Sequence, residues 1–192
     1  MGALVRPACV PVSVVTITAA NPSVASDVAN GNVVWGGRCG VFVDVVSNIT
    51  VDDPTLLVLN QTDCLANGHV VSAEEDALFD LGRNTGADVV VYFIQSDVAG
   101  FRGCAAHPPG RRGAWVGDVA TDWTFIHEIT HVVGDNAHVG NCRNPQVGDT
   151  DNLMFCNTGA LTNLPPDLSE QQCARILADP ALLDIGSMVS NL

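Results

Sequence analysis

The segment TFIHEITHVVG, residues 124–134, decides the fold of this chain. It places the pattern H-E-x-x-H inside an apolar run, which predicts a helix ending at Gly134. Residues four apart lie on one face of a helix, so His127 and His131 can reach one metal ion, and imidazole nitrogen suits zinc. Glu128 can project towards the water that the metal activates, act as general base and then pass the proton to a leaving amine.

The alternative is a pair of histidines that simply faces solvent. The flanking residues argue against it, because Ile126, Ile129 and Val132 are apolar and predict a buried helix. Polar side chains in a buried helix need partners. A shared metal ion would provide one.

A catalytic zinc site needs a third protein ligand beyond this helix. Gly134 can turn the chain sharply, and His138 follows the turn. Asp135 is the rival candidate. We expect His138 to be the third ligand, because no other side chain in the loop suits zinc as well.

These residues resemble the metzincin clan of zinc endopeptidases, whose motif is H-E-x-x-H-x-x-G-x-x-H followed by a methionine-containing turn, the Met-turn. The chain matches the motif through Gly134 and then departs from it. Ala137 stands where the clan has its third histidine, and His138 comes one residue later. A one-residue extension of the loop would absorb the shift. Some relatives of the clan use aspartate as the third ligand, which keeps Asp135 open.

The Met-turn is matched by NLMF, residues 152–155. The resemblance implies that Met154 forms an apolar floor beneath the zinc ligands without binding the metal. Some metzincins carry a tyrosine two residues after this methionine, which can assist the oxyanion. Cys156 occupies that position here, so the oxyanion would depend on zinc and on other donors.

The resemblance extends to adamalysin/reprolysin-like members of the clan. Residues 88–94, 103–106 and 114–117 look like the strand, bulge and antiparallel edge strand that precede the active-site helix in those proteins. There the edge strand binds substrate by strand addition, which implies a substrate-binding role for Ala114, Trp115, Val116 and Gly117. Residues 157–159 are expected to shape the S1′ pocket, which takes the side chain after the scissile bond.

Hydrophobic patterns predict the remaining elements. β-branched residues indicate a strand at 10–18 rather than a cleaved signal peptide. Residues 88–94 form an almost continuous apolar run, which indicates a central strand covered on both faces. Helices are expected at 22–30, 72–83, 122–133 and 169–178. The first should end at Gly31, and the others should be capped by Ser72 with Glu75, by Asp122 and by Ser169. Short strands are expected at 33–35, 41–46 and 56–59.

Together with these patterns, the resemblance implies an α/β (α+β) metzincin-like fold. We expect a twisted mixed β-sheet with helices, an active-site helix at the base of a cleft, and a small irregular C-terminal subdomain. With 192 residues, the chain is expected to form a single catalytic domain. Its upper subdomain would span 1–134 and its lower subdomain 135–192.

Composition narrows the possible partners. A hydrophobic content of 47% with 15% charged residues excludes general disorder. The net charge of −13 should repel phosphate backbones, so nucleic acid is not expected as a partner. No apolar run reaches the roughly 18 residues of a membrane span, and no membrane partner is expected. The expected partner is a polypeptide substrate, and the protein is expected to be a monomer.

Seven cysteines without a CxxC pair favour disulfides over a thiolate zinc site. Three bridges would leave one thiol, and the pairing stays open. We therefore expect a secreted or extracytoplasmic protein. Arg38-Cys39-Gly40 resembles a cysteine switch, but its place inside the domain favours a structural cysteine. Residues 149–151 could bind calcium, although a solvated turn is the preferred interpretation.

The sequence thus predicts a zinc-dependent endopeptidase. His127, His131 and His138 would hold Zn²⁺, and Glu128 would be the catalytic base. The alternative is a non-catalytic zinc-binding pseudoenzyme or binding domain, which the displaced third histidine keeps open. Glu128 argues against that alternative, because a structural zinc site needs no base.

Overall fold

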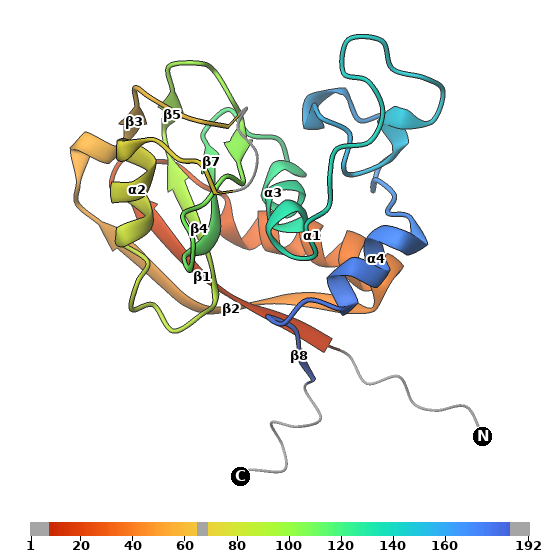
Figure 1. Ribbon diagram of the computed structural model, residues 1–192, viewed down its shortest axis with the longest axis horizontal. Coiled ribbons are helices and arrows are strands. Elements are labelled where there is room, and N and C mark those ends of the chain that lie inside the picture. Colours follow the sequence, from red (N-terminus) through yellow and green to blue (C-terminus); the bar gives the residue numbers. More distant parts are fainter. Residues whose placement is uncertain (1–7, 65–68, 185–192) are drawn as a thin grey trace.

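The computed structural model describes residues 8–64 and 69–184. Its centre is a sheet in the order β2-β1-β4-β7-β6, with β8 paired to β1 (Figure 1). The first four strands of this order are parallel to one another, whereas β6 and β8 run antiparallel to their neighbours. The sheet contains β1 (Ala8–Ile17), β2 (Val41–Val51), β4 (Val89–Ile94), β6 (Gly103–Cys104), β7 (Arg112–Gly117) and β8 (Leu183–Asp184); β3 (Val58–Leu59) and β5 (Ser96–Asp97) pair separately.

Helices cover both faces of this sheet (Figure 1). Side chains of β4 alternate between two buried clusters: Val91 belongs to the one that contains residues of α1, α3 and α4, and Tyr92 to the one that contains residues of α2. The expectation of a central strand covered on both faces is confirmed. The helices are α1 (Val24–Cys39), α2 (Ala73–Asp80), α3 (Thr124–Val132) and α4 (Glu170–Leu177).

The predicted stop at Gly31 is wrong, and so is the predicted strand at 33–35. Helix α1 continues to Cys39 and ends at Gly40, whose φ is +68°. Gly31 faces α3, where an added Cβ would lie 3.1 Å from the Cβ of Ile126. The glycine therefore permits close helix packing instead of ending the helix. Trp35 is fully buried, and its Nε1–H donates to Thr130 Oγ1 of α3 at 2.9 Å.

The segment expected at the sheet edge, residues 114–117, lies inside the sheet. Strand β7 pairs with β4 on one side and with β6 on the other. The loop after β5 folds back to form β6, which the sequence pattern did not predict as a strand. Trp115 is fully buried as a result, and its Nε1–H donates to Glu75 Oε1 at 3.2 Å. The edge of the sheet nearest α3 is therefore β6.

Capping was predicted correctly for two helices and wrongly for a third. Ser72 with Glu75 and Ser169 with Gln172 form capping boxes at α2 and α4. Helix α3 begins at Thr124 rather than at residue 122, and no side chain caps it. No helix in the described part of the chain is long and apolar enough to cross a bilayer.

Three disulfides are present, and they leave Cys9 as a buried free thiol. Cys39–Cys173 joins the end of α1 to α4, Cys64–Cys104 anchors β6, and Cys142–Cys156 closes a loop in the irregular region between α3 and α4. This agrees with the predicted three bridges and single thiol. Because Cys39 is in a bridge, the Arg38-Cys39-Gly40 sequence is part of a structural disulfide.

Candidate active site

The two faces of helix α3 lie in different environments. Phe125, Ile126 and Ile129 are buried in the core cluster shared with α1 and the sheet. His127, Glu128 and His131 line a cleft of about 1570 Å³ on the other side. The apolar packing therefore fixes the helix, and the helix directs its polar residues into the cleft.

Three imidazole rings meet at one point of this cleft. The Nε2 atom of His127 lies 3.2 Å from that of His131 and 3.2 Å from that of His138. The Nε2 atoms of His131 and His138 are 3.0 Å apart. These spacings suit zinc, since tetrahedral ligands with bonds of about 2.0–2.1 Å stand about 3.3 Å from one another.

The tautomers of two rings follow from their hydrogen bonds. The Nδ1 of His127 lies 2.7 Å from the carbonyl of Leu153, and the Nδ1 of His131 lies 2.5 Å from the carbonyl of Asn136. A carbonyl only accepts, so both Nδ1 atoms carry the proton and both Nε2 atoms offer a lone pair. Lone pairs that converge in this way repel one another unless a cation lies between them. This convergence is the observation that fits these residues to a metal ion.

Burial keeps the imidazoles neutral. Desolvation lowers the pKa of His127 to about 4, against the hydrogen bond to Leu153. Desolvation and the two neighbouring histidines lower the pKa of His131 well below its usual value, and desolvation lowers that of His138. Neutral rings are the form that binds a metal at pH 7.

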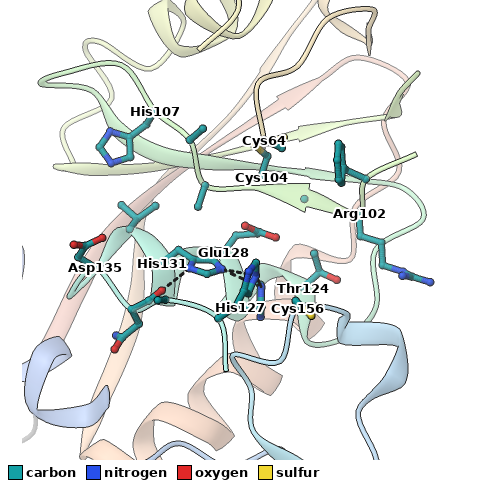
Figure 2. Close-up of a pocket in the computed structure, with 18 of the residues that line it drawn as sticks. Cys64, Arg102, Cys104, His107, Thr124, His127, Glu128, His131, Asp135 and Cys156 are labelled. Atoms are coloured by element: carbon teal, nitrogen blue, oxygen red, sulfur yellow. Dashed lines mark hydrogen bonds between the residues drawn. A yellow bond between two sulfur atoms is a disulfide. The ribbon is translucent and has the colours of Figure 1, made fainter. Parts of the chain in front are cut away.

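The turn after α3 accommodates the displaced third histidine. Gly134 has φ +87° and Asp135 has φ +48°, so two successive residues adopt the left-handed conformation. A Cβ at Gly134 would lie 2.7 Å from the main chain of Arg175 in α4, so glycine is needed for space as well. Among the described residues, the group that brings three potential ligand atoms together here is His127, His131 and His138, without Asp135. Figure 2 shows the Asp135 carboxylate away from the point where the rings of His127 and His131 meet.

The turn around Met154 holds two of these histidines through its main chain. The Leu153 carbonyl accepts from His127, and the Met154 carbonyl accepts at 2.9 Å from the N–H of Val139, next to His138. The Met154 side chain is fully buried in the core cluster that also contains Phe125 and Ile129 of α3. Its role as an apolar floor beneath the ligands stays a prediction.

The side chain of Glu128 lies between helix α3 and the edge strand β6. Its side chain is close to β6, because a Cβ at Gly103 would lie 2.8 Å from the Glu128 Oε1. Burial raises the pKa of Glu128 to about 8. A dication held by the histidines would act in the opposite direction and favour the carboxylate.

The cleft runs from one end, which contains His107 and Asp135, to another, which contains Arg102, Thr124 and Cys156 (Figure 2). Residues 103–106 line its upper side, whereas residues 114–117 do not line it and are buried. The expected role of Ala114–Gly117 as an exposed substrate-binding edge is therefore not compatible with the structure. The position suited to strand addition belongs to β6.

Sequence reasoning missed Arg102 and Thr124 as residues of the cleft. Thr124 lies three residues before His127 on the same helix face, so helical spacing alone could have found it. Arg102 could not be found in that way, because its place depends on the fold-back of β6 against β7.

The proposed calcium loop gains no support. Asp149 Oδ2 accepts from the N–H of Gln146 at 2.7 Å, and Asp151 Oδ1 accepts from Thr162 Oγ1 at 2.9 Å. These carboxylates stabilise their own turn, and among the described residues they belong to no cluster of potential metal ligands. The solvated-turn interpretation fits residues 149–151.

Sequence comparison finds no relatives: no protein-family model matches the chain, and no curated protein matches it. Solved structures do match. Metalloproteinase-II from Bacteroides fragilis is similar over 90% of this chain and 53% of its own, with a TM-score of 0.58 and 13% identity. Archaemetzincin from Methanopyrus kandleri is similar over 88% of this chain and 93% of its own, with a TM-score of 0.51 and 16% identity.

A third structure, described as a chaperone-substrate complex, matches 89% of this chain and 34% of its own, with a TM-score of 0.59 and 15% identity. The chain thus spans about half, or less, of the length of two of these three proteins. At such identities the likeness concerns the fold. The mixed sheet, the four helices of the described residues and these matches show that the chain has a metzincin-like fold.

Proposed function

We propose that this protein is a zinc-dependent endopeptidase. The observation that carries the proposal is the convergence of three imidazole Nε2 atoms within 3.2 Å of one another beside Glu128, in an open cleft of a metzincin-like fold. His127, His131 and His138 would hold the zinc, with His138 in preference to Asp135.

In this proposal Glu128 moves the proton. Its carboxylate accepts a proton from the attacking water and later donates it to the amine nitrogen of the leaving peptide. Zinc, when bound, lowers the pKa of water and polarises the scissile carbonyl. The main-chain carbonyls of Leu153 and Asn136 keep the His127 and His131 rings in the tautomer that points Nε2 at the metal.

The substrate would be a polypeptide that binds in extended form along β6. This strand ends the sheet, so its outer edge offers main-chain groups for strand addition. The Glu128 side chain lies against Gly103 of this strand. A peptide on the edge would therefore pass over both the base and the three histidines.

Several finer assignments belong to the same proposal. The adamalysin-like resemblance is supported by the antiparallel β6 before the active-site helix and by the capped closing helix α4. Secretion into an oxidising compartment is supported by the three disulfides. We propose that the protein acts as a monomer.

The competing function is a zinc-binding protein without turnover. A structural zinc site is closed by four protein ligands, whereas a catalytic site keeps one position open. The described residues bring three ligand atoms together at this point, which favours the enzyme.

The experiment is cleavage of an unfolded protein substrate by the purified protein, before and after chelation and after zinc is added back. We expect cleavage that chelation abolishes and zinc restores. Full cleavage after the zinc has been removed would contradict the proposal. Absence of cleavage by a protein shown to contain one zinc per chain would favour the competing function.

A further inference from the structure

The cleft end beyond Glu128 is lined by polar groups, and one of them is cationic. Thr124 lies one helical turn before His127, and its Oγ1 is 2.9 Å from Thr158 Oγ1. Arg102 and Asn157 complete this end of the cleft. We call these four residues the Arg102 subsite.

The exposed Arg102 guanidinium is held at this end of the cleft by the segment that follows Met154 (Figure 2). Its Nη1–H donates to Asn157 Oδ1 at 2.9 Å, and the same oxygen accepts from the N–H of Gly159 at 3.0 Å. A Cβ at Gly159 would lie 2.9 Å from Arg102 Nη2, so the glycine leaves the space that the guanidinium occupies. This bond uses one of the five N–H donors of arginine.

Arg102 also lacks a carboxylate partner among the residues that the structure describes. The ion pairs found there involve Arg38, Arg83, Arg111 and Arg112. The cleft carboxylates are Glu128, Asp135 and Asp179. Asp179 pairs with Arg112, Asp135 lies at the opposite end (Figure 2), and none of the ion pairs found among the described residues joins Glu128 to Arg102. In a protein with a net charge of −13, this end of the cleft presents a free cation.

The direction of β6 decides which substrate residue reaches this cation. The strand runs from Gly103 to Cys104, away from Arg102. A peptide added antiparallel to its free edge runs the other way, so the part after the scissile bond passes Arg102. Thr124 places the same subsite one helical turn from His127, on the side of the cleft where the residue directly after the scissile bond would lie.

We propose that the enzyme cleaves before acidic residues, and that Arg102 recognises the carboxylate of an aspartate or glutamate at P1′, the residue after the scissile bond. Guanidinium donates to carboxylate in a planar fork, and Asn157 fixes the orientation of that fork. The inference rests on the proposed function and names the substrate class of the same cleft.

The test uses peptides that differ only at P1′, with aspartate, asparagine, leucine or lysine. We expect wild-type kcat/KM to be about tenfold higher for aspartate than for asparagine, as suits one charge-assisted contact at an exposed site. Arg102→Gln should bring this ratio close to one, and Arg102→Glu should make lysine the preferred residue. Arg83→Gln removes the same charge from an exposed position in the turn after α2 and should leave the ratio as in the wild type.

The same peptides are then bound to the Glu128→Gln variant and followed by fluorescence anisotropy. The aspartate peptide should bind more tightly than the asparagine peptide, and adding Arg102→Gln should remove the difference. An aspartate-to-asparagine ratio unchanged by Arg102→Gln, or a wild-type preference for leucine, would overturn the inference. If Glu128-dependent cleavage is seen in that case, the proposed function still stands. If no peptide is cleaved and none is bound, both the inference and the proposed function are overturned.

Discussion

The Nδ1–H of His127 donates to the main-chain carbonyl of Leu153 at 2.7 Å, so the turn that carries Met154 also orients the first histidine of the site. The same turn binds the segment of His138 through the Met154 carbonyl and the Val139 N–H. The turn that carries Met154 therefore helps to position the histidine cluster through its main chain.

This relationship predicts that Asn152 affects zinc affinity, although its hydrogen bonds do not involve the histidines. Its Oδ1 accepts from the Met154 N–H, and its amide exchanges two hydrogen bonds with Gln172. Asn152→Ala should loosen the turn, lower zinc affinity by about tenfold and cost about 1–3 kcal/mol in the free energy of unfolding. Titration calorimetry with zinc checks the affinity. Gln171→Ala, at an exposed position of α4, is the control; equal affinity in both variants would contradict the account.

A pair of variants tests which residue is the third zinc ligand. His138→Ala should remove one of three nitrogen ligands and lower zinc affinity by several orders of magnitude, whereas Asp135→Ala should bind zinc nearly as the wild type does. Metal analysis after dialysis measures the zinc that each variant retains. Retention by His138→Ala together with loss by Asp135→Ala would assign the third position to Asp135.

Asp179 should stabilise the turn that follows α3. Its Oδ2 accepts from Arg112 and from the Gly134 N–H, both at 2.7 Å, and its side chain is 6% exposed. Burial alone would raise the pKa of Asp179, but the hydrogen bonds from Arg112, Ala181 and Gly134 and the Arg112 charge lower it. The stability it provides should be present above about pH 4 and be lost below it, as the carboxylate is protonated.

Asp179→Ala should therefore cost about 2–3 kcal/mol at pH 7, as expected when one partner of a partly buried, charge-assisted hydrogen bond is removed. The cost should shrink towards pH 3. Urea unfolding of wild type and variant at both pH values measures it. A cost that is independent of pH would mean that packing, and not the charge, accounts for the effect.

Asp27 should show the opposite pH dependence. Burial and the charge of Asp122 raise the pKa of Asp27 to about 6. A raised pKa means that the folded state favours the protonated acid, so stability is lost as the pH rises from about 4 to 6. Asp27→Asn should stabilise the protein at pH 8 by about 1 kcal/mol, after allowance for partial exposure, and have little effect at pH 4. Thermal unfolding checks this, with Asp52→Asn as an exposed control; destabilisation at pH 8 would contradict it.

Local patterns were enough to predict the features that depend on neighbours in sequence. The spacing of His127 and His131 placed both rings on one helix face, and the Ser72 and Ser169 capping boxes formed as expected. The burial of both faces of β4 also followed from its continuous apolar run. In each case the sequence signal lies within one element.

Features that depend on distant contacts could not be predicted. Gly31 would end an isolated helix, but in the fold it lets α1 approach Ile126 of α3. Residues 114–117 have the pattern of a short edge strand, and only the fold-back of Gly103 and Cys104 places them in the interior. Arg102 reaches the cleft for the same reason.

If Glu128 is the base of a zinc endopeptidase, its loss should abolish turnover without removing the metal, so Glu128→Ala is compared with wild type at equal zinc content. Both proteins are loaded with zinc, their metal content is measured, and cleavage of one unfolded protein substrate is followed. We expect one zinc per chain in both proteins, with kcat about 10²–10⁴-fold lower in the variant. Equal turnover by the two proteins at equal zinc content would contradict this expectation.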